Sequence, residues 1–412
     1  MQILRFAPEV SPPRVIAAVA ALVLAASCGP HSIAEQRADR ASRASGDVVI
    51  GVAWPWQARR ELRFGDGLDM AVAEINASGG IDGRHIRLEK SDDHESADDG
   101  RAVAQKFDAD PNVVAVIGHL QSYVSVPAAS IYDNGGLVMV APAATDPELT
   151  SLGYRRVFRA TFTDKAVGHR MADFAAARGY RRVAIEYVRN TYGRDLSNAF
   201  EEHAVDLGLT IAARESYGAE ATTADTFDPT VREWKTLGID AIFLAGEVPS
   251  AAYFVTSARR SGLTVPIIGG DALGTGALMS IAGAAAEGTI VPSVFHPDEP
   301  RAEVERFDAA FRRRFNAVPD AGSALGYDAV NLLAAAMKQA HSVAPDRVAT
   351  ALHHLHDWRG VTGTFAFDST GDLGDRPMVT MVVHNGRFEY MPAPQRLTAM
   401  RRDSATARSS LR

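Results

Sequence analysis

Cysteine is nearly missing from this chain, whose 412 residues include a single one, Cys28. A lone thiol forms no intramolecular disulfide and cannot build a cysteine-based zinc site. Basic charge is not in excess either, because 43 Lys and Arg stand against 50 Asp and Glu, a formal net charge of −7. An acidic chain gives no support to nucleic-acid binding, so no nucleic-acid partner is expected.

The sequence signatures of several enzyme classes are also missing. The chain has no Walker A motif, no G-x-G-x-x-G segment after a strand and no G-x-S-x-G elbow. His353 and His356 have a spacing that metal ligands can use, but without acidic partners we interpret them as an exposed helix end. The acids between 92 and 99 fail the EF-hand pattern and are interpreted as a solvated helix start. The sequence therefore predicts no catalytic residue, no metal and no cofactor.

What is present is an ordinary globular composition, with 46% hydrophobic and 23% charged residues. At about 100–200 residues per domain, the length suggests two domains. Continuous apolar runs at 48–52 and 113–117 are typical of strands buried on both faces, and 64–78 has apolar residues at helical spacing. This alternation of strand-like and helix-like segments restarts after Thr163. We therefore expect two α/β domains with parallel sheets, and ligand-binding loops at the carboxyl ends of their strands.

Both ends of the chain differ from this globular part. Residues 1–27 combine basic residues, a short apolar run and small residues, which is typical of a secretory signal peptide. The residues just before Cys28 also resemble a bacterial lipobox, so Cys28 is expected to carry lipid; a cleaved signal with an incidental cysteine is the alternative. Residues 28–46 are expected to form a flexible tether and residues 393–412 a disordered basic tail.

Several motifs fall in or near the expected loops: EINA at 74–77, GHL at 118–120 with Ser122, APAATDPELT at 141–150, AGAAAEG at 282–288 and YDAV at 327–330. Over roughly 48–388 they resemble the bacterial periplasmic leucine/isoleucine/valine-binding proteins. The resemblance implies a type I periplasmic-binding-protein fold, in which two Rossmann-like lobes with parallel sheets are joined by three crossing segments. Lobe 1 would comprise 47–163 and 294–377, and lobe 2 would comprise 164–293 and 378–392.

This resemblance also implies a function. Such a protein captures a small amino-acid-like solute outside the cytoplasm by hinge closure and delivers it to the permease and ATPase of an ABC importer. We expect a monomer that is held at the membrane through Cys28 or is free in the periplasm. A ligand sensor that feeds a receptor or regulator is an alternative, as is a binder of amides or urea-like solutes.

The resemblance places six binding residues. Ser122, expected as a helix N-cap, and Thr145 would bind a ligand carboxylate. Ala143 and Ala144 share the Thr145 loop, in which a backbone carbonyl would accept from the ligand ammonium. Asp271 would pair with that ammonium, and Tyr192 would form a pocket wall. Without the resemblance, Ser122 is an ordinary helix cap, Asp271 a turn residue and Tyr192 a packing residue.

Other positions depart from the family pattern. Arg60 and Glu247 stand where the family has aromatic pocket residues, and Gln121 replaces a cysteine whose partner position holds Glu95. An aliphatic pocket should not hold Arg60, Gln121 and Glu247 unless they pair with each other or with a polar ligand. Trp54 and Trp56 add aromatic surface that could contact the ligand or pack between the lobes. We therefore expect an amino-acid-like ligand with a polar or larger side chain.

Overall fold

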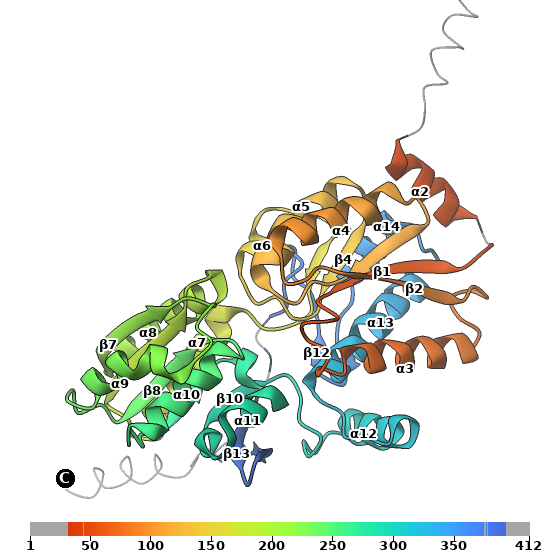
Figure 1. The fold of residues 1–412 in the computed structure, drawn as a ribbon. Coiled ribbons are helices and arrows are strands. Elements are labelled where there is room, and N and C mark those ends of the chain that lie inside the picture. Colours follow the sequence, from red (N-terminus) through yellow and green to blue (C-terminus); the bar gives the residue numbers. More distant parts are fainter. Residues whose placement is uncertain (1–31, 44, 375, 377, 393–412) are drawn as a thin grey trace, which may run out of the picture.

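Two β-sheets organise the chain into two halves, which Figure 1 shows next to each other with helices packed around each sheet. The computed structural model describes residues 32–43, 45–374, 376 and 378–392. The expected signal peptide, Cys28 and the basic tail lie outside these residues. Within the described ranges, every helix is too short or too polar to cross a lipid bilayer.

Lobe 1 is built on a five-stranded parallel sheet of order β2-β1-β3-β4-β5. All residues of β1, β3 and β4 are buried, because helices cover both faces of the sheet. Along β1, Val48, Ile50 and Val52 face one apolar cluster, and Val49 and Ala53 face another. The strands are β1 (Val48–Trp54), β2 (Ile86–Asp92), β3 (Val113–Ile117), β4 (Val138–Ala141) and β5 (Val157–Arg159).

The helices of lobe 1 divide between these two clusters. Helices α4 (Ala97–Ala109) and α5 (Ser122–Asn134) cover one face, and α3 (Phe64–Ala77), α13 (Ala321–Ala340) and α14 (Pro345–His353) cover the other. A short helix α6 (Glu148–Ser151) precedes β5. Helices α3 and α13 approach closely at Gly67, where an added Cβ would lie 1.9 Å from the Ser323 carbonyl oxygen.

Lobe 2 is built on a seven-stranded sheet of order β14-β13-β10-β9-β8-β6-β7. Strands β13 and β14 run antiparallel to their neighbours, so this sheet is mixed. Its strands are β6 (Arg182–Val188), β7 (Thr210–Tyr217), β8 (Ala241–Ala245), β9 (Ile267–Gly269), β10 (Ile290–Ser293), β13 (Val379–His384) and β14 (Arg387–Met391). Its helices are α7 (Asp164–Ala177), α8 (Thr191–Asp206), α9 (Asp228–Trp234), α10 (Ser250–Arg260) and α11 (Gly276–Ala282).

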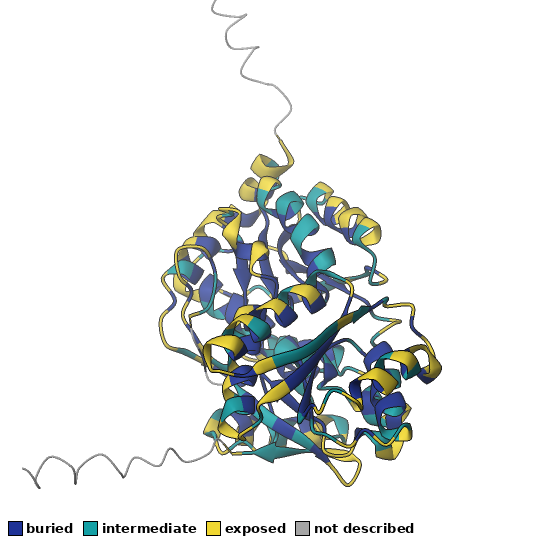
Figure 2. Ribbon diagram, turned by 90° about the vertical axis from the view of Figure 1, so that its left-hand side faces the viewer, coloured by how far each residue is buried: buried dark blue, intermediate teal, exposed yellow. Residues whose placement is uncertain are grey.

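The chain passes between the two lobes three times: after β5, after β10 and before β13. Between the second and third crossings lie α12 (Ala302–Phe315), α13, α14 and a hairpin of β11 (Trp358–Gly360) and β12 (Gly363–Phe365). In Figure 2 both sheets are largely buried, whereas the outer faces of the helices are exposed.

The expectation of a flexible tether over 28–46 is wrong for part of that segment. Residues Ile33–Ser42 form helix α2, which begins with a capping box between Ser32 and Glu35. Arg37 is fully buried, and its guanidinium donates to the carbonyls of Val113 and Asp108 at 2.7 and 2.6 Å. The segment looked too polar to dock because its anchor is an arginine, whose N–H groups are satisfied by carbonyls of lobe 1.

The acidic run at 92–99 is only partly a solvated helix start. Asp93 is fully buried, and its Oδ2 lies 2.7 Å from Nδ1 of His119, which is also buried. The other ring nitrogen of His119 lies 3.1 Å from the Tyr132 hydroxyl. The interpretation failed at Asp93 because a carboxylate can be buried when a partner distant in sequence supplies the hydrogen bond.

Candidate ligand-binding cleft

A cavity of about 150 Å³ lies between the two lobes. Its walls come from the ends of β1 and β10, from the loops that follow β1, β3 and β4 in lobe 1 and β6, β8 and β9 in lobe 2, from the start of α13, and from Thr161 and Val294 in two of the crossings. The carboxyl ends of both sheets therefore meet at the cavity, as expected for a ligand site in open α/β sheets. The size suits a small solute, since it lies below the usual range for drug-sized ligands.

One part of the lining combines hydroxyl groups with a carboxylate: Ser122 and Thr145 from lobe 1, and Tyr192 and Asp271 from lobe 2. We call these four residues the hydroxyl–carboxylate group. The Tyr192 hydroxyl donates to Asp271 Oδ1 at 3.0 Å and accepts from the Ala272 N–H at 3.3 Å. Gly270 is needed for this approach, because a Cβ there would lie 2.4 Å from the Tyr192 oxygen.

Ser122 is the first residue of α5, and Gln121 is the N-cap, which corrects the expectation that Ser122 itself caps this helix. The N–H groups of Val124 and Ser125 both donate to the Gln121 carbonyl. The Ser122 hydroxyl accepts from the Asp146 N–H at 3.2 Å, which ties α5 to the Thr145 loop. Ser122 therefore brings a hydroxyl and the positive end of a helix into the cavity wall.

Burial raises the pKa of the carboxylates around this group. The pKa of Asp271 is raised by burial, although the Tyr192 hydroxyl opposes the shift. The pKa of Asp164 is raised well above its ordinary value by burial and by nearby Asp271. Asp164 is nearly inaccessible to solvent, and its N–H donates to the Thr145 carbonyl at 2.9 Å. Two carboxylates in this low-dielectric region favour a cation beside them.

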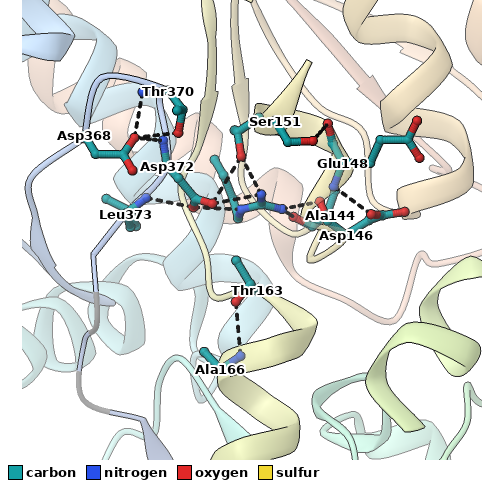
Figure 3. A network of polar contacts seen from close by, with 12 residues as sticks. Ala144, Asp146, Glu148, Ser151, Thr163, Ala166, Asp368, Thr370, Asp372 and Leu373 are labelled. Atoms are coloured by element: carbon teal, nitrogen blue, oxygen red, sulfur yellow. Dashed lines mark hydrogen bonds and ion pairs between the residues drawn. The ribbon is translucent and has the colours of Figure 1, made fainter. Parts of the chain in front are cut away.

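Arg159 on β5 holds the Thr145 loop in place, and Figure 3 labels three of its partners, Ala144, Asp146 and Asp372. Its buried guanidinium donates to the carbonyls of Ala144 and Asp146 at 3.3 and 2.6 Å and pairs with Asp372 at 2.9 Å. Ala144 is buried and outside the cavity lining, and its carbonyl already accepts this hydrogen bond. The expectation that Ala144 lines the site is therefore wrong, whereas Ala143 and Thr145 do line it.

A second part of the lining is charged, but the arginine in it is Arg59 and not Arg60, which is exposed. Arg59 forms an ion pair with Glu95 and donates through Nη1 to the Val248 carbonyl of lobe 2 at 2.6 Å. We call Arg59, Glu95, Gln121 and Glu247 the arginine–glutamate group. The expectation for Arg60 is wrong by one position, because the sequence does not reveal the backbone conformation of the turn after β1.

Gln121 and Glu247 line the cavity from opposite lobes. Gln121 Nε2 donates to the Glu95 carboxylate, and the Asn190 side chain donates to Glu247 Oε1 at 3.1 Å. Burial raises the pKa of Glu247, with nearby Glu95 and Asp271 acting in the same direction and Arg59 against it. Glu247 therefore pairs with neither Gln121 nor Arg59 through a direct contact.

The two tryptophans differ in their position relative to the cavity. Trp54 lines the cavity and stacks on Phe64 with ring centroids 3.7 Å apart. Trp56 lies outside the lining, and its indole N–H donates to the Ser91 carbonyl at 3.0 Å, so only Trp54 of the two contributes to the cavity wall. Sequence reasoning also missed Leu62, Leu120 and Leu325 of the lining. Leu120 stands in the GHL motif beside Ser122, which was a signal for it, whereas nothing in the sequence context of Leu62 and Leu325 distinguishes them from core leucines.

Two α/β lobes that converge on one small cavity with polar groups in its wall define a bilobal solute-binding protein. A family model described as periplasmic binding protein matches residues 57–387. The chain is also 33% identical, over 84% of its length and 93% of the relative's, to a Leu/Ile/Val-binding protein homolog of Brucella abortus. It belongs to the periplasmic-binding-protein family, among the Leu/Ile/Val-binding homologues, and is a solute-binding protein, not an enzyme.

Solved structures show the same fold. An ABC transporter substrate-binding protein from Desulfitobacterium hafniense, in complex with Leu, is 38% identical, with a TM-score of 0.76 over 84% of this chain and 100% of that chain. A branched-chain amino acid transporter substrate-binding protein from Streptococcus pneumoniae, in complex with isoleucine, is 27% identical, with a TM-score of 0.77 over 83% of this chain and 98% of that chain. The type I periplasmic-binding-protein fold is therefore confirmed.

Proposed function

We propose that the protein is the extracytoplasmic solute-binding component of an ABC importer and that it captures a free α-amino acid by closing its lobes. One observation carries the proposal: the hydroxyls of Ser122 and Thr145 on lobe 1 share a small cavity with Asp271 and Tyr192 on lobe 2. The hydrogen bond from Arg59 to the Val248 carbonyl already joins the two lobes beside the cavity. The Leu and isoleucine complexes of the related proteins support the choice of an amino acid.

The chemistry of the hydroxyl–carboxylate group fits an amino acid's charged end. A ligand carboxylate would accept from the hydroxyls of Ser122 and Thr145 and would lie at the positive end of α5. A ligand ammonium would pair with Asp271, whose pKa is raised by burial and would fall once a cation lies beside it. Because the carboxylate contacts lobe 1 and the ammonium contacts lobe 2, the ligand stabilises the closed form.

Calorimetric titration of the purified protein with the twenty standard amino acids tests this function. We expect at least one to bind, and its N-acetyl and carboxamide derivatives to bind at least about 100-fold more weakly, since each loses one charged anchor. If the N-acetyl derivative binds as tightly as the free amino acid, the role given to Asp271 is wrong. If no free amino acid binds, the proposed function is wrong.

Membrane attachment through Cys28 belongs to the same proposal and is supported by the lipobox-like residues before it. The full-length chain with Cys28→Ser should move from the membrane fraction to the soluble extracytoplasmic fraction of expressing cells. A matched Ser27→Ala variant, which keeps the thiol, should stay with the membrane. If the cysteine variant fractionates like the wild type, Cys28 is not the anchor.

A further inference from the structure

The arginine–glutamate group contains polar atoms that the described residues leave without partners. Gln121 is 7% exposed, and its Oε1 accepts no hydrogen bond from a described residue. The orientation of this amide is fixed, because its Nε2 donates to Glu95, and a carboxylate can only accept. A buried amide oxygen without a donor costs free energy, so the lining has room for one N–H group.

Glu247 offers a second acceptor in the same lining. The described residues give its carboxylate one hydrogen bond, from Asn190 to Oε1. Arg59 forms no ion pair with Glu247, because its guanidinium pairs with Glu95 and donates through Nη1 to the Val248 carbonyl. An ionised carboxylate has about four acceptor positions, so Glu247 can accept from further donors.

Trp54 supplies a donor to this wall. Its indole lies in the lining and is 1% exposed, and Nε1–H has no acceptor among the described residues. The adjacent Trp56 shows the contrast, because its indole N–H donates to a backbone carbonyl away from the cavity. An unpartnered acceptor on Gln121, a carboxylate with spare acceptor positions on Glu247 and an unpartnered donor on Trp54 therefore belong to residues that line one cavity of about 150 Å³.

We propose that Gln121, Glu247 and Trp54 form a specificity site for a ligand side chain that carries N–H donors. The proposal rests on the amino-acid binding proposed above and names its substrate class: amino acids whose side chain ends in a carboxamide or an ammonium, not in hydrocarbon. A carboxamide would donate to Gln121 or Glu247 and accept from Trp54, whereas an ammonium would use the acceptors alone. Leu62, Leu120 and Leu325 in the lining would contact the methylene groups that lead to the polar end.

The charge of the lining agrees with this ligand class. Its ionisable carboxylates are Glu61, Glu247 and Asp271, and its cation is Arg59. The ammonium of an amino acid would pair with Asp271, and its carboxylate would contact neutral donors. Glu247 would then stay uncompensated unless the side chain also donates to it, and burial already makes its ionised form costly.

Binding of shape-matched amino acids tests the proposal on the wild-type protein. The pairs are L-asparagine against L-leucine, L-glutamine against L-homoleucine, and L-lysine against L-2-aminoheptanoic acid, each measured by titration calorimetry. We expect the polar member of at least one pair to bind at least about tenfold more tightly, because a site with buried polar groups rejects a ligand that leaves them unpaired. Preference for asparagine or glutamine identifies a carboxamide, and preference for lysine identifies an ammonium.

The alternative outcomes separate this proposal from the one it rests on. If the hydrocarbon member binds equally or more tightly in all three pairs, amino-acid binding stands and the specificity site is wrong. If no amino acid binds at all, both proposals fail together.

Variants then assign the preference to residues. Gln121→Leu and Glu247→Gln should each reduce the polar-over-hydrocarbon ratio at least about fivefold while hydrocarbon ligands still bind. As a matched control, Glu233→Gln makes the same change from Glu to Gln at an exposed position of α9 in lobe 2 and should leave the ratio unchanged. An unchanged ratio in both site variants would overturn the assignment, and retained hydrocarbon binding shows that they have folded.

Discussion

The two lobes bury polar groups in different ways. In lobe 1 two fully buried cations are fully engaged: Arg37 and Arg159 each donate to several carbonyls, and Arg159 also pairs with Asp372. In lobe 2 two carboxylates have few partners, the buried Glu186 in the sheet and the half-buried Glu247 at the cavity. Buried charge is stable when paired and hydrogen-bonded, and costly otherwise. Lobe 1 thus pairs its two most buried arginines within the protein, whereas lobe 2 keeps carboxylates with free acceptor positions; at the cavity, Gln121 and Trp54 of lobe 1 also keep atoms that a ligand can use.

The largest expected effect lies in lobe 1. Arg159→Met should lower the free energy of unfolding by about 3–5 kcal/mol, because it removes the cation that pairs with Asp372 and the donor to two carbonyls. Urea denaturation followed by circular dichroism measures the change. Arg156→Met removes a partly exposed arginine that pairs with Asp346 and should cost less than about 1 kcal/mol. Equal losses in the two variants would contradict the view of Arg159 as the anchor of the Thr145 loop.

The next effect belongs to lobe 2 and concerns binding. Asp271→Asn keeps the shape of the side chain but removes its charge, so the affinity for the bound amino acid should fall about 100-fold. Titration calorimetry measures the loss. Asp206→Asn at the exposed end of α8 is the matched control and should bind like the wild type. If both variants keep their affinity, the acceptors of lobe 2 are not what holds the ammonium.

A third prediction concerns the pH dependence of stability that Glu186, a buried carboxyl group of lobe 2, produces. Burial and nearby Glu215 raise the pKa of Glu186 from 4.5 to about 8. The folded state therefore keeps a proton that the unfolded state releases, so this contribution to stability is present below pH 4.5 and is lost as pH rises to about 8. Glu186→Gln should raise the melting temperature by a few degrees at pH 8 and leave it nearly unchanged at pH 4.5. Parallel melting curves for the two proteins at both pH values would show that Glu186 does not carry this dependence.

The sequence predicts the scaffold better than the cavity. Strands such as 113–117 were recognisable because both faces are buried and the apolar run is continuous. The short strands β5 and β10 were missed, since three or four residues carry little periodicity and β10 contains Pro292. The docked helix α2 was missed because its anchor, Arg37, is polar.

Within the cavity, the residues at strand ends were placed by the family resemblance, and Ser122, Thr145, Tyr192 and Asp271 all line it. The errors lie in turns. Arg60 was expected where Arg59 stands, because a turn of unknown winding precedes α3. Ala144 and Trp56 are turned away by hydrogen bonds to distant partners, Arg159 and Ser91, which no local pattern reveals.

The smallest predicted effect tests the lobe 1 side of the cavity, where the hydroxyls of Ser122 and Thr145 are neutral donors. Ser122→Ala should weaken amino-acid binding about tenfold, since one hydrogen bond to a charged ligand group is lost while the N–H groups at the start of α5 remain. Ser125→Ala, one turn further along α5 and buried outside the cavity lining, should bind like the wild type. A Ser122 effect as large as that of Asp271→Asn would mean that lobe 1 does more than supply neutral donors, and the contrast between the lobes would fail. An effect no larger than that of Ser125→Ala would mean that Thr145 and the N–H groups at the start of α5 bind the ligand carboxylate without the Ser122 hydroxyl.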